Sequence, residues 1–459
     1  MGPILKRAYR RGLQENFMFV KSKSSVSALT NFSIDLFEQK KYKQAEKLCR
    51  KLLKKDAENY TALINLANVL FIKKEFAEAL SLYQQADVLK PDYYPVKINL
   101  ANTYLETENF EAAVQYANEA LALDSQSYLG WNILGNALLE KEEYQAAVDA
   151  LEKAEKLDSS DPWLYNSLSR AYQQTADYAK ALKAGWQAVG LSAGEDSQQI
   201  NFGYLLYETA MENNAAEVKD YARRWLKNYP ENQIALHMGN AVINEEKIER
   251  ANDGYLQNIF DVFAPDFEQV LSSLDYQTPQ QIGGFLEQFY AADSHPKLKI
   301  LDAGCGTGLC GKYLKKYAGF FSLSGVDLSS EMLKIAKAKK LYNRLYCQEL
   351  NTFLGGRKKA YDLIVSADVL TYFGSLDSLF ANLFSALKKS GRVIFSVTAN
   401  EQNDEDYFLH ISGRFQHHET YIKRLLQDNG FILEKQERTR LRKEGEQEVW
   451  GWIFAARRP

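Results

Sequence analysis

The chain has 459 residues, of which 46% are hydrophobic and 25% are charged, and its formal net charge is −3. Length and composition are those of a soluble globular protein with two or three domains. The near-balance of charge argues against a general nucleic-acid binder. No apolar run approaches the length of about 18 residues that a membrane span requires. We therefore expect neither nucleic acid nor a membrane span.

The four cysteines are scattered and form no Cys-x-x-Cys pair: Cys49, Cys305, Cys310 and Cys347. This spacing predicts reduced thiols in a cytoplasmic protein rather than a disulfide framework or a zinc site. The sequence also contains no clustered set of His, Asp and Glu that would suggest metal ligands, so we expect no metal.

Residues 1–25 are strongly basic, with a single acid, Glu15. Their basic residues are Lys6, Arg7, Arg10, Arg11, Lys21 and Lys23. A solvated tail, a transit peptide and a basic helix that meets a surface all fit this pattern, although the apolar core of a secretory signal is missing. We expect residues 1–26 to form a tail or a short capping helix.

The next region repeats every 34 residues. The period is marked by the aromatic residues Tyr42, Phe76, Phe110, Tyr144 and Tyr178. Three residues after each aromatic stands an alanine: Ala45, Ala79, Ala113, Ala147 and Ala181. A fixed period of this length is typical of helical hairpins, each of which needs stacked neighbours to cover its apolar face. The pattern resembles the tetratricopeptide repeat family, with five repeats over 27–193 and a degenerate sixth repeat or cap over 194–245.

This resemblance implies a concave face that binds an extended segment of a protein or peptide partner. Asparagines recur on the first helix of successive repeats: Asn65, Asn68, Asn99, Asn102, Asn132 and Asn136. They could form a ladder of amides for a peptide backbone, or they could simply be solvated polar positions.

From residue 297 onward, short apolar runs alternate with helical stretches. We expect strands at 298–303, 321–326, 344–348, 361–366, 391–397, 431–439 and 447–456. We expect helices near 307–316, 329–338, 375–388 and 417–428. The alternation predicts a mostly parallel sheet covered on both faces, and a turn at 442–445 would join the last two strands as an antiparallel hairpin. Residues 246–296 would be a linker with lid helices, leaving 297–459 as the sheet domain.

A glycine-rich turn follows the first strand, with Gly304, Gly306 and Gly308 at every second position after Asp302. Glycine permits positive φ and a close approach of backbone to ligand, and the free N–H groups of a helix start follow. Nineteen residues beyond Gly308, Asp327 ends the second strand, where a carboxylate can accept hydrogen bonds from both hydroxyls of a ribose. The turn and this acid together indicate a nucleoside cofactor.

The spacing departs from the dinucleotide pattern G-x-G-x-x-G and resembles motif I of class I S-adenosylmethionine-dependent methyltransferases. The resemblance implies an all-α helical-hairpin solenoid followed by an α/β, seven-stranded Rossmann-like domain, with S-adenosyl-L-methionine as cofactor. It assigns cofactor binding to Asp302, Gly304, Gly306, Gly308, Asp327, Leu328, Met332, Glu349, Leu350, Asp368 and Tyr255. Glu349 and the Leu350 backbone would contact the adenine edge, and Leu328 and Met332 its face. Ordinary packing would also explain these residues.

Tyr255 lies in the expected lid segment, where aromatics would cover the cofactor and exclude water. Docking of that segment onto the repeats would explain the same aromatics. The order of repeats, lid and sheet domain resembles bacterial repeat-fused methyltransferases. Their late motif, Gly-Arg-aromatic-x-His, matches residues 413–417.

Methyl transfer requires an aligned nucleophile and, for some acceptors, removal of a proton. Asp368 could steer or deprotonate the acceptor, or hold the cofactor's amino group. Tyr372 could orient the acceptor or pack in the core. His417 could act as a general base or cap the helix that starts near it. Arg414 is a further polar candidate.

Three functions remain open. The first is a protein methyltransferase whose repeats recruit the substrate. The second is a small-molecule methyltransferase that its repeats dock to an assembly. The third is a non-catalytic cofactor-binding scaffold. The sequence does not specify the acceptor atom, the partner or the oligomeric state.

Overall fold

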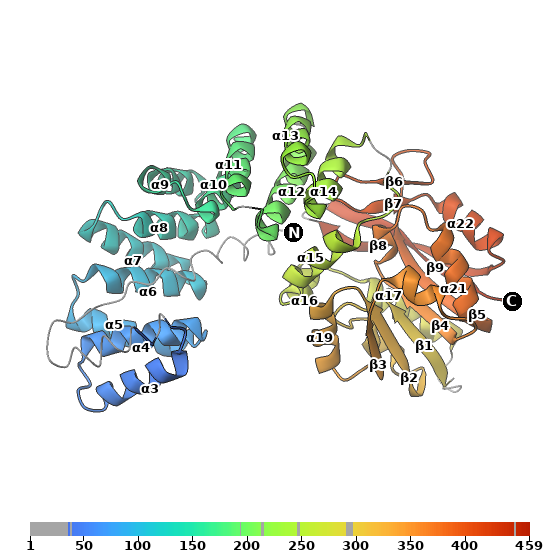
Figure 1. Cartoon of the computed structure of the whole chain (residues 1–459), viewed down its shortest axis with the longest axis horizontal. Coiled ribbons are helices and arrows are strands. Elements are labelled where there is room, and N and C mark those ends of the chain that lie inside the picture. Colours follow the sequence, from blue (N-terminus) through green and yellow to red (C-terminus); the bar gives the residue numbers. More distant parts are fainter. Residues whose placement is uncertain are drawn as a thin grey trace. The chain divides into compact units, whose positions relative to one another are not determined.

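The computed structural model describes residues 35–36, 39–192, 194–212, 215–245, 248–290, 297–444 and 447–459. The predicted N-terminal tail and the start of the first repeat lie outside these ranges. The described chain divides between Gln198 and Gln199 into two compact units. Each unit is described by itself, and Figure 1 colours the chain from the repeats in blue to the last strands in red.

The first unit is a series of helical hairpins, which confirms the predicted repeats. Its helices are α3 (Tyr42–Leu53), α4 (Tyr60–Ile72), α5 (Phe76–Leu89), α6 (Tyr94–Glu106), α7 (Phe110–Leu123), α8 (Tyr128–Glu140), α9 (Tyr144–Leu157), α10 (Pro162–Gln174) and α11 (Tyr178–Leu191). Each aromatic of the 34-residue period is the first residue of a helix, namely of α3, α5, α7, α9 and α11.

The turn inside each hairpin has the same backbone geometry. Two residues before each aromatic, the chain adopts a positive φ of 57° to 64°, at Lys40, Lys74, Glu108, Glu142 and Ala176. Small residues let the paired helices approach closely: a Cβ added at Gly135 would lie only 2.5 Å from the Leu151 side chain. The period therefore encodes both the turn and the helix contact.

The predicted asparagine ladder is buried, so the interpretation as solvated positions is wrong. All six side chains are at most 5% exposed. Asn99 Nδ2 donates to Asn68 Oδ1 at 3.0 Å, joining the first helices of adjacent repeats. Asn136 Nδ2 donates to Asn132 Oδ1 at 2.7 Å, and Ser167 Oγ donates to Asn136 Oδ1 at 2.8 Å. The bonds Asn99–Asn68 and Ser167–Asn136 link first helices of adjacent repeats, and Asn136–Asn132 lies within α8. Peptide binding by the ladder stays a prediction.

The second unit begins with helices and ends with the sheet. Its first helices are α12 (Asp196–Met211, counted in this unit from Gln199), α13 (Ala215–Asn228), α14 (Gln233–Ile243), α15 (Asp253–Phe263), α16 (Phe267–Ser273) and α17 (Thr278–Phe289). Residues 199–243, within the expected degenerate repeat, belong to the same compact unit as the sheet. His237 of α14, for example, donates from Nε2 to the carbonyl oxygen of Gly413 at 2.8 Å.

The sheet has seven strands in the order β3-β2-β1-β4-β5-β9-β8, which confirms the predicted fold. The strands are β1 (Leu298–Ala303), β2 (Ala318–Asp327), β3 (Arg344–Cys347), β4 (Tyr361–Ser366), β5 (Leu387–Thr398), β8 (Ile432–Glu444) and β9 (Gln447–Arg457). β1 to β5 pair in parallel, and β9 is antiparallel to both β5 and β8. The remaining elements are α18 (Gly311–Leu314), α19 (Ser330–Ala338), α20 (Leu350–Gly355), η3 (Leu370–Tyr372), α21 (Asp377–Ala386) and α22 (Glu419–Asp428).

Apolar side chains bury both faces of the sheet. Leu301 and Ile364 pack on one face with residues of α20, α21 and α22. Ile300 and Leu363 pack on the other face with residues of α17 and α18. Alternation along each strand thus separates the two cores and leaves the carboxyl ends of the parallel strands for the site.

Two local predictions are wrong, and one small element was missed. The helix expected over 307–316 is shorter, because only Gly311–Leu314 is α-helical. A small hairpin of β6 (Tyr407–Leu409) and β7 (Phe415–His417) was not foreseen. The turn expected at 442–445 fails because β8 continues through Glu444, and Gly445 lies outside the described residues. The charged sequence there resembles a turn, yet Arg442 and Glu444 pair within the strand.

Within the described ranges, no helix combines the length and apolar character needed to traverse a bilayer. The same ranges contain no group of three or more His, Cys, Asp or Glu side chains arranged to hold a metal ion.

Candidate active site

The glycine-rich turn after β1 has a backbone that only glycine adopts without strain. The φ angles of Gly304, Gly306 and Gly308 are 73°, 51° and 92°. A Cβ added at Gly304 would lie 2.2 Å from Cγ2 of Val369, in the loop after β4. The backbone of Gly304 therefore packs directly against the Val369 side chain of that loop.

Asp327 ends β2 and is bonded to this turn. Its Oδ2 accepts from the backbone N–H of Gly306 at 2.8 Å, and its Oδ1 accepts from the N–H of Ser329 at 2.9 Å. Burial raises the pKa of Asp327, and the backbone N–H groups oppose that rise. The structure thus brings together the two features that the sequence analysis linked, the glycines and the acid.

Asp302 lies in β1, two residues before Gly304, and its side chain is buried next to the turn. Its carboxylate is 1% exposed and accepts from the Tyr342 hydroxyl at 2.6 Å. Tyr342, which the sequence analysis missed, also lies against Gly308, where an added Cβ would be 2.9 Å from its ring. Burial raises the pKa of Asp302 to about 7, although the bond from Tyr342 opposes the rise. Direct contact of Asp302 with a cofactor stays a prediction.

The raised pKa of Asp302 predicts a pH effect on stability. The folded chain binds this proton more tightly than the unfolded chain, whose aspartates titrate near pH 3.9, so the free energy of unfolding should fall as pH rises from about 4 to 7. Asp302→Asn cannot ionise. Between pH 5 and 8 the cofactor-free variant should therefore lose about 2 to 3 kcal/mol less stability than the unsubstituted protein. Denaturant unfolding at both pH values measures this, and equal pH dependence would contradict it.

The residues predicted to contact adenine are buried or hydrogen-bonded to other parts of the chain. Glu349 caps α20, since its carboxylate accepts from the N–H groups of Asn351 at 2.7 Å and Thr352 at 2.6 Å. Met332 is 1% exposed and Leu350 is 7% exposed. Leu328 is half-buried, and its carbonyl oxygen accepts from the Cys347 thiol. Packing and capping account for these side chains in the structure, and adenine contact stays a prediction.

The lid aromatic that lies against the turn is Phe267, and Phe260 packs on it. An added Cβ at Gly306 would lie 3.7 Å from the Phe267 ring. Phe260 packs edge-on against Phe267, with ring centroids 6.2 Å apart, and against Tyr372, with centroids 5.4 Å apart. Lid helix α15 is fixed beside the turn because Asp261 accepts from the Ser329 hydroxyl at 2.5 Å.

Tyr255 faces α14 instead. It is 4% exposed, its ring centroid lies 4.1 Å from that of His237, and its hydroxyl points to the sulfur of Met238 at 3.3 Å. The prediction that Tyr255 covers the cofactor is not supported; the docking alternative describes it better, and the docking is onto α14.

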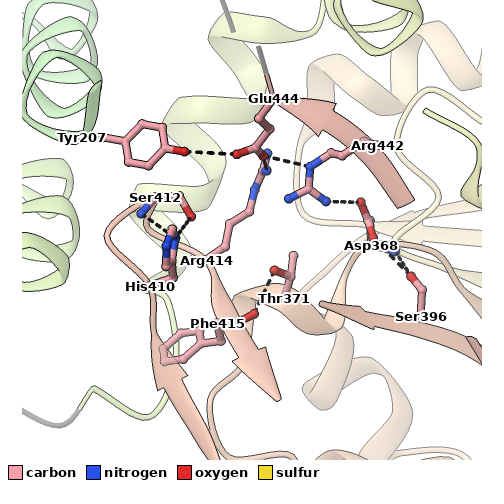
Figure 2. Close-up of polar contacts among 10 residues, drawn as sticks. All are labelled: Tyr207, Asp368, Thr371, Ser396, His410, Ser412, Arg414, Phe415, Arg442 and Glu444. Carbon is pink, nitrogen blue, oxygen red and sulfur yellow. Dashed lines mark hydrogen bonds and ion pairs between the residues drawn. The ribbon is translucent and has the colours of Figure 1, made fainter. Parts of the chain in front are cut away.

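Asp368 lies in the loop after β4 and is held on two sides. Its φ is 56°, unusual for a residue other than glycine. Arg442 Nη1 donates to Asp368 Oδ2 at 2.9 Å, and the Ser396 hydroxyl donates to Oδ1 at 3.2 Å. Figure 2 shows this pair reaching from β8 to the loop after β4. Asp368 is therefore oriented by a guanidinium that the sequence analysis missed.

The ion pairs continue beyond Arg442 into a network of Asp368, Arg442, Glu444, Arg414 and Tyr207, drawn in Figure 2. Arg442 Nε donates to Glu444 Oε1 at 2.9 Å, Arg414 Nη1 donates to the same oxygen, and the Tyr207 hydroxyl of α12 donates to Glu444 Oε2 at 3.3 Å. Burial would raise the pKa of Glu444, but Arg442 and Arg414 lower it to about 2. We call this set the arginine network.

His417 does not join this network. It is fully buried in β7, and its Nε2 donates to the carbonyl oxygen of Gly374 at 3.1 Å. Burial lowers the pKa of His417 to about 4. The predicted helix cap is His418 instead, whose Nδ1 accepts from the N–H of Thr420 at 3.3 Å. The structure thus places His417 in the core, and a role as general base stays a prediction.

Comparison with known proteins agrees with this geometry. A family model described as a methyltransferase domain matches residues 274–436, and one described as a tetratricopeptide repeat matches 30–94 and 98–162. The chain therefore combines tetratricopeptide repeats with a methyltransferase domain. The methyltransferase match agrees with the S-adenosylmethionine cofactor that the glycine turn and Asp327 led us to expect.

Individual relatives match part of the chain. A malonyl-[acyl-carrier protein] O-methyltransferase of Priestia megaterium is 34% identical over 106 residues, 23% of this chain and 38% of that protein. The human methyltransferase-like protein 27 is 41% identical over 88 residues, 19% of this chain and 35% of that protein. The magnesium protoporphyrin IX methyltransferase of Synechocystis PCC 6803, solved with bound S-adenosylmethionine, is 20% identical with a TM-score of 0.31, covering 52% of this chain and 97% of that chain. The chain thus spans little more than a third of the length of the two curated relatives.

Proposed function

We propose that the protein is an S-adenosylmethionine-dependent methyltransferase that acts on a protein substrate recruited by its repeats. The observation that carries the proposal is the 2.8 Å bond from the Gly306 N–H to Asp327, because it sets bare glycine backbone beside a carboxylate at the ends of parallel strands. A nucleoside with an amino-acid tail would fit beside this turn, because glycine backbone lets a ligand approach closely. When bound, this cofactor supplies an activated methyl group.

The chain's own residues would divide the binding as follows. Asp327 would accept from the ribose hydroxyls, and the backbone of Gly304 and Gly306 would face the amino-acid end. Glu349, with a lone pair remaining on each oxygen, would accept from the adenine amino group. Phe260 and Phe267 would exclude water from the reacting centre, where a low dielectric strengthens polar contacts.

A protein substrate is favoured by the repeats, because arrays of helical hairpins offer an extended surface for segments of other proteins. The Priestia megaterium relative and one from Bacillus anthracis are both named malonyl-[acyl-carrier protein] O-methyltransferase, and a malonyl group on acyl-carrier protein is carried by a protein. A small-molecule acceptor, with the repeats docking the enzyme to an assembly, is the alternative.

The test is to incubate the full-length protein with methyl-labelled S-adenosylmethionine and a cell lysate split into macromolecular and small-molecule fractions. We expect label in the macromolecular fraction, and no label with the Asp327→Ala variant. Label confined to the small-molecule fraction would overturn the protein substrate. Label in neither fraction would overturn the methyltransferase activity and leave only a cofactor-binding scaffold.

A further inference from the structure

Arg414 has donor capacity that the arginine network does not use. It follows Gly413, whose positive φ of 76° and bond from His237 fix the backbone there. Of its N–H groups, only one bonds to an acceptor among the described residues, the Glu444 carboxylate. The Arg414 side chain keeps 24% of its surface exposed. A guanidinium has five N–H donors, so several remain available to a ligand.

Two tyrosines lie on the segments that contact Arg414 and its partner Glu444. Thr371, next to Tyr372, donates from its hydroxyl to the carbonyl oxygen of Phe415, next to Arg414, at 3.1 Å. Tyr204 lies one helical turn before Tyr207, whose hydroxyl donates to Glu444. Burial would lower the pKa of Arg414, but Glu444 outweighs that effect and raises it, with smaller contributions from Tyr372, Tyr204 and Asp368. Burial raises the pKa of Tyr204, and Arg414 and Tyr372 also act on it. Among the described residues, the hydroxyls of Tyr204 and Tyr372 have no hydrogen-bond partner. One guanidinium and two hydroxyls therefore offer unused donors in one region.

This region borders the glycine turn. Tyr372 packs against Phe260 at 5.4 Å, and Phe260 packs against Phe267, the ring nearest Gly306. The loop that contains Tyr372 also carries Asp368, and its Val369 packs against Gly304. Tyr204 approaches from α12, with its ring centroid 6.2 Å from that of Phe263 of the lid. The donors thus lie on the side of the turn where an acceptor would enter.

Charge specifies what the donors would bind. Arg414 and Arg442 carry two positive charges, and Glu444 and Asp368 carry two negative charges, so the arginine network is neutral. An anionic acceptor would take charge-assisted hydrogen bonds from the unused N–H groups of Arg414, and such bonds are stronger than those between neutral groups. A planar carboxylate also matches the fork of a guanidinium.

A carboxylate also fits the positions of Asp368 and His417, the two predicted bases. Asp368 is bonded to Arg442 and Ser396, and His417 is buried in the β6–β7 hairpin. Amine and hydroxyl acceptors need a proton removed, whereas a carboxylate is already ionised at neutral pH.

We propose that Arg414, with Tyr204 and Tyr372, binds a carboxylate group of the acceptor. The proposal rests on the proposed function, since it assumes a cofactor beside the same site. Arg414 and the two tyrosines are then residues that determine acceptor specificity. The carboxylate could belong to a small organic acid or to a peptide.

The experiment is calorimetry with full-length protein saturated with S-adenosylhomocysteine. Malonate and a short peptide with acidic side chains and blocked ends are the two probes, and malonamide is the neutral control. We expect at least one acidic probe to bind, and the tighter of the two identifies the source of the carboxylate. Arg414→Gln should raise the dissociation constant of that probe at least ~10-fold, and Tyr204→Phe about 3-fold, as loss of one charge-assisted and one neutral hydrogen bond implies.

The matched control is Arg438→Gln, which removes an arginine of the same strand as Arg442 that pairs with Glu401 at the surface. It should leave probe binding unchanged. Tyr204→Phe and Tyr372→Phe keep the proposal testable if Arg414→Gln fails to fold. Absence of acidic-probe binding, equal malonamide binding, or no effect of the substitutions would overturn the carboxylate site. If S-adenosylhomocysteine itself does not bind, the proposed function fails instead, and the two failures are distinguishable.

Discussion

Replacing Asp327 with alanine should weaken cofactor binding at least ~100-fold, since hydrogen bonds to a charged group contribute about 1.5 to 3 kcal/mol each and two ribose hydroxyls would lose their acceptor. The same substitution releases the N–H of Gly306, which Asp327 holds at 2.8 Å, so the glycine turn also loses its anchor. Calorimetric titration of the full-length variant with S-adenosylhomocysteine measures the change. Unchanged affinity would refute the site.

A second aspartate provides a matched control. Asp362 is the second residue of β4, and its carboxylate accepts from the backbone N–H of Lys299 at 2.8 Å. It therefore makes the same kind of bond as Asp327 does to Gly306, but at the amino ends of the strands. Asp362→Ala should disturb the strand ends to a similar degree and leave cofactor affinity within about 2-fold. A comparable loss in both variants would mean that Asp327 acts through folding alone.

Replacing Glu444 with alanine should destabilise the sheet unit by about 3 to 5 kcal/mol, the range observed when one partner of a buried ion pair is removed. Two guanidinium groups, those of Arg414 and Arg442, share this carboxylate, and the Arg442 side chain is 4% exposed. Because the pKa of Glu444 is lowered to about 2, its stabilisation is complete above the unfolded value near 4.3 and is lost as pH falls towards 2. Denaturant unfolding at pH 7 and at pH 3 tests both statements.

The surface acid Glu401 is the comparison, since it pairs with Arg438 where both side chains are more than 40% exposed. Glu401→Ala should cost at most about 1 kcal/mol, as exposed pairs usually do. If Glu444→Ala costs no more than Glu401→Ala, the arginine network is not a buried structural element.

The features that could be predicted from the sequence are those encoded locally. A hairpin turn, a helix pair and a glycine-rich turn each depend on residues within about 34 positions, so Tyr42 and its equivalents, and Gly304 with Asp327, were identified from spacing alone. The parallel order of the strands followed in the same way from alternation of short strands and helices.

The arginine network could not be predicted because its members are far apart in sequence. Tyr207 and Glu444 are separated by 237 positions, and Arg442 and Asp368 by 74. In the sequence, Arg442 and Glu444 belong to a charged run that is typical of an exposed turn. Their alternation at i and i+2, which places both on one face of a strand, was the available signal.

The roles of His417, His418 and Tyr255 could not be predicted because they depend on tertiary packing. His417 and His418 are adjacent, and only the course of the backbone decides which one is buried and which caps α22. Tyr255 was assigned to the cofactor by resemblance, but its ring packs against His237 of α14. The repeat pattern did not specify the position of α14.

The left-handed residue that recurs two positions before each repeat aromatic has an evolutionary consequence. Because Lys74, Glu108, Glu142 and Ala176 close their hairpins with nearly the same φ, one hairpin has almost the same local geometry as the next. Gain or loss of a whole 34-residue module would therefore preserve every remaining turn. The number of repeats can therefore change by duplication or deletion while the unit that starts at residue 199 keeps its structure.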